Sequence, residues 1–258
     1  MKRIAFITSS EDPNLVDDDR LAIPFLEKRG LSVEALVWDR PNNFSRYDAL
    51  IFRSCWNYHH KLGEFQSWLE GLRKLQIPIL NSLDTVEWNL NKKHILELAV
   101  HVPRTEYIEM KTIISKRDLS LILSQISDGP VVLKPAVSLN GNDTFLMNGL
   151  DPIHEKLSLL LKSRDMLIQE FIPEIKTSGE VSLVFFNRVF SHAIRKMASE
   201  NEFRIHAEYG GTRNSVQASH SSLDYSERIL KDLPMKLLYA RVDLVETPRG
   251  PRLIELEL

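Results

Sequence analysis

The sequence contains one cysteine, Cys55, and no apolar run of the roughly 18 residues that a membrane-spanning helix needs. A single cysteine cannot form an internal disulfide bond, so nothing in the sequence indicates an oxidising compartment. The apolar stretch behind the basic start runs only from Ile4 to Ile7, which is too short for a signal peptide. We therefore expect a cytoplasmic protein without a membrane partner.

An excess of charge of either sign is also lacking. Lys and Arg number 33 against 35 Asp and Glu, which leaves a net charge of −2 and gives no electrostatic reason to expect a nucleic-acid partner. The dinucleotide fingerprint GxGxxG does not follow the first apolar strand, and no Walker A sequence is present, which argues against NAD-binding and P-loop proteins. The 258 residues, 43% of them hydrophobic, suffice for one large domain or two to three lobes.

The first 84 residues alternate apolar strands with amphipathic helices, which predicts an α/β domain with an open parallel sheet. The expected strands are Ile4–Ile7, Val33–Trp38, Ala49–Phe52 and Ile77–Leu80, and the expected helices are Asp17–Arg29 and Glu64–Leu75. The pattern changes after this point, so we place a domain boundary at residue 84.

The remaining residues predict a mixed α+β region. We expect helices at Val86–Ala99, Asp118–Ser127 and Tyr225–Leu238, the last one shortened or kinked by Pro234. The expected strands are Thr105–Glu109, Val131–Leu133, Met166–Ile172, Val181–Phe186, Val189–Lys196, Ala240–Val245 and Leu253–Leu258, with a polar loop at Ser138–Asn148. The strands Val181–Phe186 and Val189–Lys196 are joined by Asn187-Arg188, which indicates a hairpin.

An acidic hairpin at the end of the sequence is its most informative feature. Side chains alternate along a strand, so Glu255 and Glu257 share one face, and a turn near Arg249 places Asp243 opposite Glu255. Three carboxylates held together repel one another unless a cation lies between them, and oxygen ligands on a sheet suit Mg²⁺. The alternative, left open by this segment alone, is an edge hairpin whose acidic side chains face water.

Other segments fit a nucleotide site. Lys134 ends an apolar strand, where its charge can contact a phosphate, and Lys92 lies on an expected helix; each can equally be a solvated surface lysine. The small polar residues around Gly141 can fold backbone N–H groups around phosphate oxygens, unless they form an ordinary turn. The stretch Gln169-Glu170-Phe171-Ile172 can form a slot for adenine, although core strands look similar.

Taken in order, these segments resemble the ATP-grasp superfamily, and in particular its glutathione-synthetase-like and cycloserine-biosynthesis-like ligases. The matching motifs are Arg53-Ser54-Cys55-Trp56-Asn57-Tyr58, Trp88-Asn89 with Lys92, Val132-Leu133-Lys134-Pro135, Gln169-Glu170-Phe171, Gly179-Glu180-Val181-Ser182-Leu183, Ser191-His192-Ala193 with Arg195-Lys196, Tyr209-Gly210-Gly211-Thr212, Ala240-Arg241-Val242-Asp243 and Glu255-Leu256-Glu257. The usual family ending is Glu-x-Asn, from which Glu257 departs. Family members also continue beyond the position of Leu258, and whether this end is natural or trimmed is left open.

The resemblance implies an ATP-grasp fold behind a Rossmann-like N-terminal domain, with domains at residues 1–84, 85–165 and 166–258. It implies roles for the following residues: Lys92 and Lys134 on the phosphates, Gln169, Glu170, Phe171 and Ile172 at adenine, Glu180 at the ribose or the second substrate, Arg241 at the transferred phosphate, and Asp243, Glu255 and Glu257 on Mg²⁺ or Mn²⁺.

The implied activity is an ATP-dependent ligation of a small-molecule carboxylate to an amine through an acyl phosphate. Because such catalysis depends on positioning and charge stabilisation, Arg195, Arg204 and Arg241 are candidates to clamp the carboxylate or acyl phosphate. Arg53 follows a strand and either recognises a substrate or is structural.

Two rival functions remain open: a small-molecule kinase on the same fold, and a nucleotide-binding module without turnover. Cys55 beside His59 and His60 gives only a weak indication of a metal site, because the histidines are adjacent and one sulfur is present. The sequence leaves open whether the protein forms a homo-oligomer.

Overall fold

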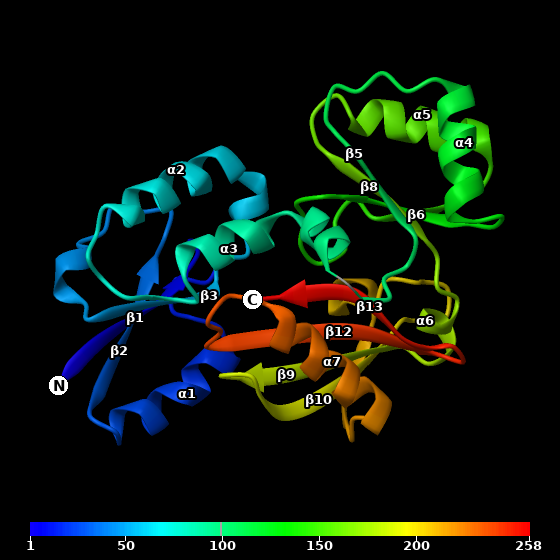
Figure 1. Cartoon of the computed structure of the whole chain (residues 1–258). Helices are drawn as coiled ribbons and strands as arrows, with labels where there is room; N and C mark the ends of the chain where they lie inside the picture. Colours follow the sequence, from blue (N-terminus) through cyan, green and yellow to red (C-terminus); the bar gives the residue numbers. More distant parts are fainter. Residues whose placement is uncertain (99) are drawn as a thin grey trace. The chain divides into compact units, whose positions relative to one another are not determined.

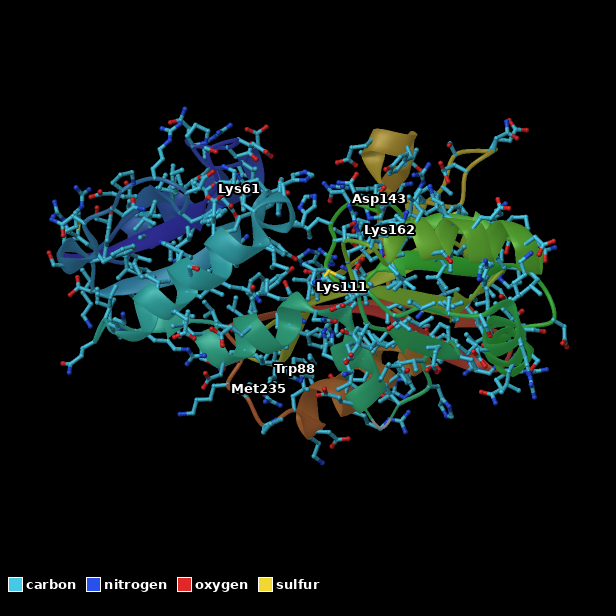
Figure 2. The ribbon with its side chains drawn as sticks, turned by 90° about the horizontal axis from the view of Figure 1, so that it is seen from above. Lys61, Trp88, Lys111, Asp143, Lys162 and Met235 are labelled. Atoms are coloured by element: carbon cyan, nitrogen blue, oxygen red, sulfur yellow. The ribbon has the colours of Figure 1, made fainter. Side chains whose placement is uncertain are left out.

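The computed structural model describes residues 1–98 and 100–258 and divides the chain into two compact units. The first unit holds Met1–Trp88 together with Met235–Leu238, and the second holds Asn89–Pro234 and Tyr239–Leu258. Trp88 and Met235, where the chain leaves and re-enters the first unit, are labelled in Figure 2. Within the described residues, no helix combines the length and apolarity that crossing a bilayer requires.

The first unit is built on a parallel sheet, as its alternating pattern predicts. Strands β1 (Lys2–Thr8), β2 (Leu31–Val37), β3 (Ala49–Ser54) and β4 (Ile79–Leu80) lie in the order β2-β1-β3-β4, and their pairings are parallel. The helices are α1 (Asp17–Glu27) and α2 (Leu62–Arg73), with short 3₁₀ turns at Phe44–Arg46 and Tyr58–His60. Helix α2 buries Phe65, Leu69 and Leu72, one apolar face at helical spacing.

A helix and a 3₁₀ segment replace the single helix expected from Val86 to Ala99. Helix α3 spans Leu83–Leu90, and the 3₁₀ segment spans Lys92–Glu97. Asn91 between them has extended dihedral angles, and its side chain accepts a hydrogen bond from the Lys93 N–H, so a new turn begins there. The expected end of the helix at Ala99 lies outside the described residues. Prediction of one continuous helix was therefore wrong.

An antiparallel four-stranded sheet forms the first part of the second unit. Its order is β5-β8-β6-β7, with β5 at Thr105–Ile108, β6 at Val131–Pro135, β7 at Phe145–Met147 and β8 at Met166–Glu170. Helices α4 (Lys116–Ile126) and α5 (Leu150–Leu160) share a buried apolar core with one face of this sheet (Figure 1). Strand β7 was expected to be part of the polar loop, and α5 was not anticipated.

A second antiparallel sheet carries the acidic hairpin. Its order is β11-β10-β9-β12-β13, with β9 at Glu180–Phe186, β10 at Val189–Met197, β11 at Thr212–Val216, β12 at Tyr239–Thr247 and β13 at Gly250–Glu257. A short helix α6 (Glu174–Thr177) precedes β9, and a 3₁₀ turn spans Ala207–Tyr209.

Helix α7 (His220–Asp232) packs against β12 and β13, where Figure 1 shows it lying along the sheet. It begins earlier than the expected Tyr225, since the Ser219 side chain caps it by accepting a hydrogen bond from the Ser222 N–H. It ends before Pro234, as the proline predicts. The sheet face away from α7 carries Glu180, Lys196, Arg241 and Asp243.

Candidate active site

The acidic hairpin forms in the predicted register. Strands β12 and β13 are antiparallel, with Asp243 opposite Glu255 and Arg241 opposite Glu257. Asp243 is fully buried, and its carboxylate accepts hydrogen bonds from Nε (2.9 Å) and Nη2 (2.7 Å) of Arg241. Although burial alone would raise it, the pKa of Asp243 is lowered by the charges of Arg241 and Lys196.

A second carboxylate and a lysine complete this face of the sheet. Lys196 Nζ lies 2.9 Å from Glu180 Oε1 and 3.5 Å from Asp243 Oδ2. Gly179, just before Glu180, has φ +73°, and a Cβ there would lie 2.3 Å from the Lys196 carbonyl oxygen. Only glycine therefore lets β9 start this close to β10. Burial raises the pKa of Glu180 to about 7.

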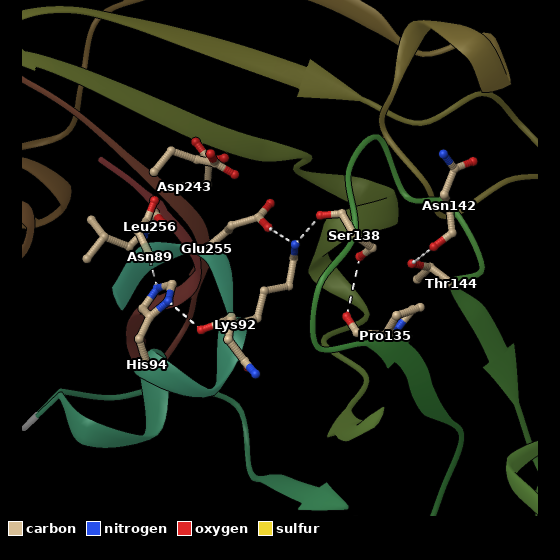
Figure 3. A network of polar contacts seen from close by, with 12 residues as sticks. Asn89, Lys92, His94, Pro135, Ser138, Asn142, Thr144, Asp243, Glu255 and Leu256 are labelled. Atoms are coloured by element: carbon tan, nitrogen blue, oxygen red, sulfur yellow. Dashed lines mark hydrogen bonds and ion pairs between the residues drawn. The ribbon is translucent and has the colours of Figure 1, made fainter. Parts of the chain in front are cut away.

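Lys92 and Lys134 meet the same cluster from outside the sheet. Lys92 Nζ lies 3.0 Å from Glu255 Oε1 and donates a hydrogen bond to the Ser138 carbonyl (Figure 3). Lys134 on β6 is buried, which lowers its pKa to about 8 even though Glu255 acts in the opposite direction. Burial would raise the pKa of Glu255, but these two lysines outweigh it and hold that pKa at about 2.

Glu257 differs from the other carboxylates of the hairpin. Its nearest cation is Arg241, whose Nη2 lies 3.7 Å from Glu257 Oε1. Burial, followed by the charge of Glu255, raises its pKa to about 6. Glu257 is thus the hairpin carboxylate that most readily takes up a proton near neutral pH.

The predicted adenine segment lies where β8 ends. Gln169 is buried, its amide donates to Thr105 Oγ1 at 2.9 Å, and by alternation it shares the sheet face of Lys134. Glu170 points to the other face and pairs with Arg104 at 3.3 Å. Phe171 and Ile172 follow in the connection towards α6. The structure thus aligns Gln169, but not the Glu170 side chain, with the basic groups.

Because β7 takes up the second part of the expected polar loop, the name polar loop is kept from here on for residues 138–144, which begin beside Lys92. Its turn is closed by hydrogen bonds from the Asn142 N–H to the Leu139 carbonyl and from the Thr144 N–H to the Gly141 carbonyl. Asn140 and Gly141 have φ values of +52° and +66°. The loop therefore carries the left-handed conformations that turn backbone N–H groups outward.

Arg195 is not part of the cluster. Its guanidinium donates to the Ser178 carbonyl (3.0 Å) and to Glu246 (3.2 Å) on the sheet face that α7 covers. Alternation along β10 places Lys196, the next residue, on the charged face instead. The structure thus places Lys196, and not Arg195, beside the carboxylates of the cluster.

A β-bulge in β10 determines that Lys196, and not Arg195, lies opposite Glu180. A hairpin turning at Asn187-Arg188 without irregularity would pair Glu180 with Arg195. The register shifts between Phe190 and His192, so that Lys196 faces Glu180. One extra residue in a strand moves every later side chain of that strand to the other face of the sheet, and no feature of the sequence indicates this bulge.

Arg204 lies apart from the hairpin carboxylates. Its Nη2 is 2.5 Å from Glu202 Oε2, and its guanidinium carbon lies 3.5 Å from the centre of the Tyr209 ring. No direct contact joins it to Asp243 or Glu255 among those found in the described residues. Its place is beside the polar loop instead, since a Cβ on Gly141 would lie 3.3 Å from Arg204 Cδ.

In the first unit, Arg53 has a structural partner. Its Nη2 lies 2.6 Å from Asp19 Oδ1, and Ser54 donates to the other oxygen of that buried carboxylate. Burial raises the pKa of Cys55, which keeps it a thiol. No group of three histidine, cysteine or acidic side chains positioned for a metal is found in residues 1–98 and 100–258, so the weak metal indication at Cys55 is not supported.

The carboxylates of the acidic hairpin do not form such a three-residue metal group in the described residues either. Asp243, Glu255 and Glu257 pair with Arg241 and Lys92 and do not converge on one point. The chemistry of the donors nevertheless fits a magnesium nucleotide. Carboxylate oxygens are ligands that Mg²⁺ prefers, and lysine ammonium groups beside them match phosphate oxygens. The metal assignment itself stays a prediction.

Two family models match the chain. Residues 92–258 match the RimK-like ATP-grasp domain, and residues 4–81 match the N-terminal domain of the D-cycloserine synthetase DcsG. Among curated proteins, the cycloserine biosynthesis protein DcsG of Streptomyces lavendulae is 26% identical over 249 residues, which cover 89% of this chain and 81% of that protein. A probable alpha-L-glutamate ligase of Rhodopirellula baltica is 22% identical over 157 residues, 60% of this chain but 37% of that ligase.

Solved structures show the same fold. The crystal structure of D-cycloserine synthetase DcsG superposes with a TM-score of 0.86 at 22% identity, covering 99% of this chain and 91% of that one. The D-alanine–D-alanine ligase of Bacillus anthracis complexed with ATP gives a TM-score of 0.70 at 14% identity, covering 100% and 86%. The predicted ATP-grasp fold is confirmed, and the chain belongs to the RimK-like ATP-grasp family.

Proposed function

We propose that the charged cluster around Asp243 and Glu255 holds Mg-ATP, or Mn-ATP, while the enzyme joins a small-molecule carboxylate to an amine. The chain is an ATP-grasp ligase that forms C–N bonds, as its family and its named relatives indicate. Those relatives give no support to the kinase or to the module without turnover. The observation that carries the site assignment is the β12–β13 register, which sets Asp243 opposite Glu255 with Lys92 3.0 Å from Glu255.

In this proposal Asp243, Glu255 and Glu257 hold the metal, which when bound neutralises charge on the nucleotide phosphates. Lys92 and Lys134 bind phosphate oxygens, and their present partner, Glu255, is then free to turn to the metal. Gln169, Phe171 and Ile172 line the adenine end. These roles require no side chain beyond those that the second unit already brings together.

The substrate carboxylate attacks the terminal phosphorus of ATP, so that the bond from this phosphorus to the bridging oxygen breaks, ADP leaves and an acyl phosphate forms. The amine then attacks the acyl carbon, the C–O bond to the phosphate breaks, and inorganic phosphate and the amine proton are released as the amide forms. Arg241 and Lys196 face the position of the transferred phosphoryl group and stabilise its charge. Because both are already fixed by Asp243 and Glu180, little reorganisation is needed when charge develops. Glu180 holds either the ribose or the second substrate.

The acid and amine belong to the class of small amino acids and their derivatives, since the similar proteins are named for cycloserine, glutamate and alanine. The cytoplasmic location also remains a prediction.

ADP release with Mg-ATP should be measured against a panel of acids, amines and alcohols that includes L-glutamate, D-alanine and D-serine. We expect release to require an acid and an amine together and mass spectrometry to find their amide. Release that depends on an alcohol instead would overturn the ligase in favour of a kinase. Replacing both Asp243 and Glu255 by Ala should abolish turnover, and retained turnover would refute the site assignment.

A further inference from the structure

One segment of the second unit, residues 199–211, lies against the polar loop but has no role in the proposal above. It runs from the end of β10 to β11 and is held in shape from within. Ser199 Oγ donates to the Tyr209 carbonyl at 3.0 Å, and Ile205 is buried beneath it. The Arg204 guanidinium stacks on the Tyr209 ring. The segment is therefore a preformed surface.

Two residues of the polar loop, Asn140 and Gly141, lie against this surface. A Cβ on Gly141 would lie 3.0 Å from His206 Nδ1, so the imidazole ring lies beside the loop and leaves little room for a side chain at residue 141. Next to it, Asn140 Nδ2 donates to Glu208 Oε1 at 3.1 Å. The pair of contacts sets both the distance and the direction in which the loop approaches the 199–211 segment.

His206 and Arg204 carry buried nitrogen atoms that the described residues leave without partners. Nδ1 of His206 and Nε of Arg204 are both inaccessible to solvent and make no hydrogen bond there. His94, also buried, differs because its Nδ1 lies 2.9 Å from the Asn91 carbonyl. An unsatisfied buried polar atom costs about 1–3 kcal/mol, so the Nδ1 of His206 lowers the stability of the folded chain instead of adding to it.

The same segment reaches both ends of the proposed nucleotide site. Phe203 contacts Phe171 edge to face, with ring centres 6.3 Å apart, at the adenine end. At the other end, the charges of Glu255, Lys196, Glu208 and Arg241 all act on His206. Burial lowers the pKa of His206, which favours the neutral form of its ring.

We propose that His206 and Glu208 are positioning residues that hold Gly141 and Asn140 of the polar loop in place to bind the nucleotide phosphates. The inference rests on the proposed function, because it assumes that the loop contacts those phosphates. In this proposal the 199–211 segment is the surface on which the polar loop packs. This packing also adds a second reason for glycine at residue 141: besides the φ of +66°, a Cβ there would press on the His206 ring.

The test compares the affinities of Mg-AMPPNP and AMP, measured by isothermal titration calorimetry. Substituting His206→Ala and, separately, Gly141→Ala should weaken Mg-AMPPNP about tenfold each, because a loop out of place must be ordered on binding. AMP, which lacks the β- and γ-phosphates, should bind each variant as it binds the wild type. A general loss of structure would weaken both ligands.

Two matched controls isolate the contact. Gly30 has a similar φ, +79°, but no atom lies within 4 Å of the position of its Cβ, so Gly30→Ala carries the backbone strain without the contact. His192 is an exposed histidine on β10. We expect Gly30→Ala and His192→Ala to bind Mg-AMPPNP like the wild type.

The double variant Gly141→Ala with His206→Ala gives the decisive result. If Gly141 acts through His206, the double variant should bind Mg-AMPPNP no more weakly than either single variant. Two results would overturn the inference: single-variant effects on Mg-AMPPNP affinity that multiply in the double variant, or a His206→Ala affinity within twofold of the wild type. Glu208 is exposed, so Glu208→Ala should fold normally, and we expect it to weaken Mg-AMPPNP binding about twofold to threefold. A wild-type chain that binds no Mg-AMPPNP would instead refute the proposed function.

Discussion

Replacing Lys92 by Met removes a positive charge at the edge of the cluster and keeps a side chain of similar length. In the structure, Lys92 Nζ lies 3.0 Å from Glu255 Oε1, and the side chain is 13% exposed. Its backbone N–H separately donates to the Ala136 carbonyl at 2.7 Å, so the substitution leaves the anchoring of the chain intact. The change therefore acts on charge.

The size of the effect follows from the kind of bond that is lost. A hydrogen bond to a charged group contributes about 1.5–3 kcal/mol. If Lys92 transfers from Glu255 to a phosphate oxygen, Lys92→Met should weaken Mg-AMPPNP binding about 10- to 150-fold. In the free protein the pKa of Glu255 should also rise from about 2, because Lys92 is the cation that lowers it most.

Isothermal titration calorimetry of Mg-AMPPNP measures the first effect, and Lys93→Met is the control. Lys93 is the exposed neighbour whose ammonium lies 4.5 Å from the centre of the Tyr107 ring, away from Glu255. We expect its loss to change nucleotide affinity less than twofold. If Lys92→Met and Lys93→Met bind Mg-AMPPNP equally well, Lys92 is no phosphate ligand and the reasoning is refuted.

Three further predictions follow from other contacts. Lys196→Met should lower ADP release with Mg-ATP at least tenfold, whereas Arg195→Met, on the opposite sheet face, should lower it less than threefold; the reverse order in a coupled assay would refute the face assignment. Hydrogen bonds from Ser10, Lys61 and Asn57 outweigh the effect of burial and lower the pKa of Asp39 from 3.8 to about 2, so Asp39→Asn should cost about 2 kcal/mol of the free energy of unfolding at pH 7. Since the folded pKa is the lower one, this stabilisation is present above pH 3.8 and is lost as the pH falls through 2. Urea denaturation measures it, and an Asp39→Asn variant that loses as much free energy of unfolding near pH 2 as at pH 7 would contradict the prediction. Ser115→Ala should lower that free energy by about 1 kcal/mol, because the Ser115 side chain caps α4; an unchanged urea midpoint would contradict the cap.

Features set by local pattern were predictable from the sequence. The parallel sheet follows from the alternation of apolar strands and helices, and the antiparallel pairing of β12 with β13 follows from two apolar runs joined by one short turn. The stop of α7 follows from Pro234. In each case a single short-range rule fixes the outcome.

Features set by distant contacts were not predictable. The bulge in β10 that selects Lys196 over Arg195 depends on how three strands fit together. The break at Asn91 is the local exception: its side chain accepts a hydrogen bond from the Lys93 N–H, and this bond competes with a continuous helix. The contact of His206 with Gly141 joins residues far apart in the sequence, and no pattern along the chain encodes it.

The short return of the chain into the first unit limits how the protein can be dissected. Met235–Leu238 belongs with Met1–Trp88, and the Leu238 N–H donates to Asn81 Oδ1 at 2.6 Å, while Leu237 is buried. A fragment cut after Trp88 would thus lose the hydrogen bond from the Leu238 N–H to Asn81 and would leave an apolar surface uncovered. Module exchange between relatives must carry this four-residue insert along, and a gene fusion at residue 88 would transplant an incomplete domain.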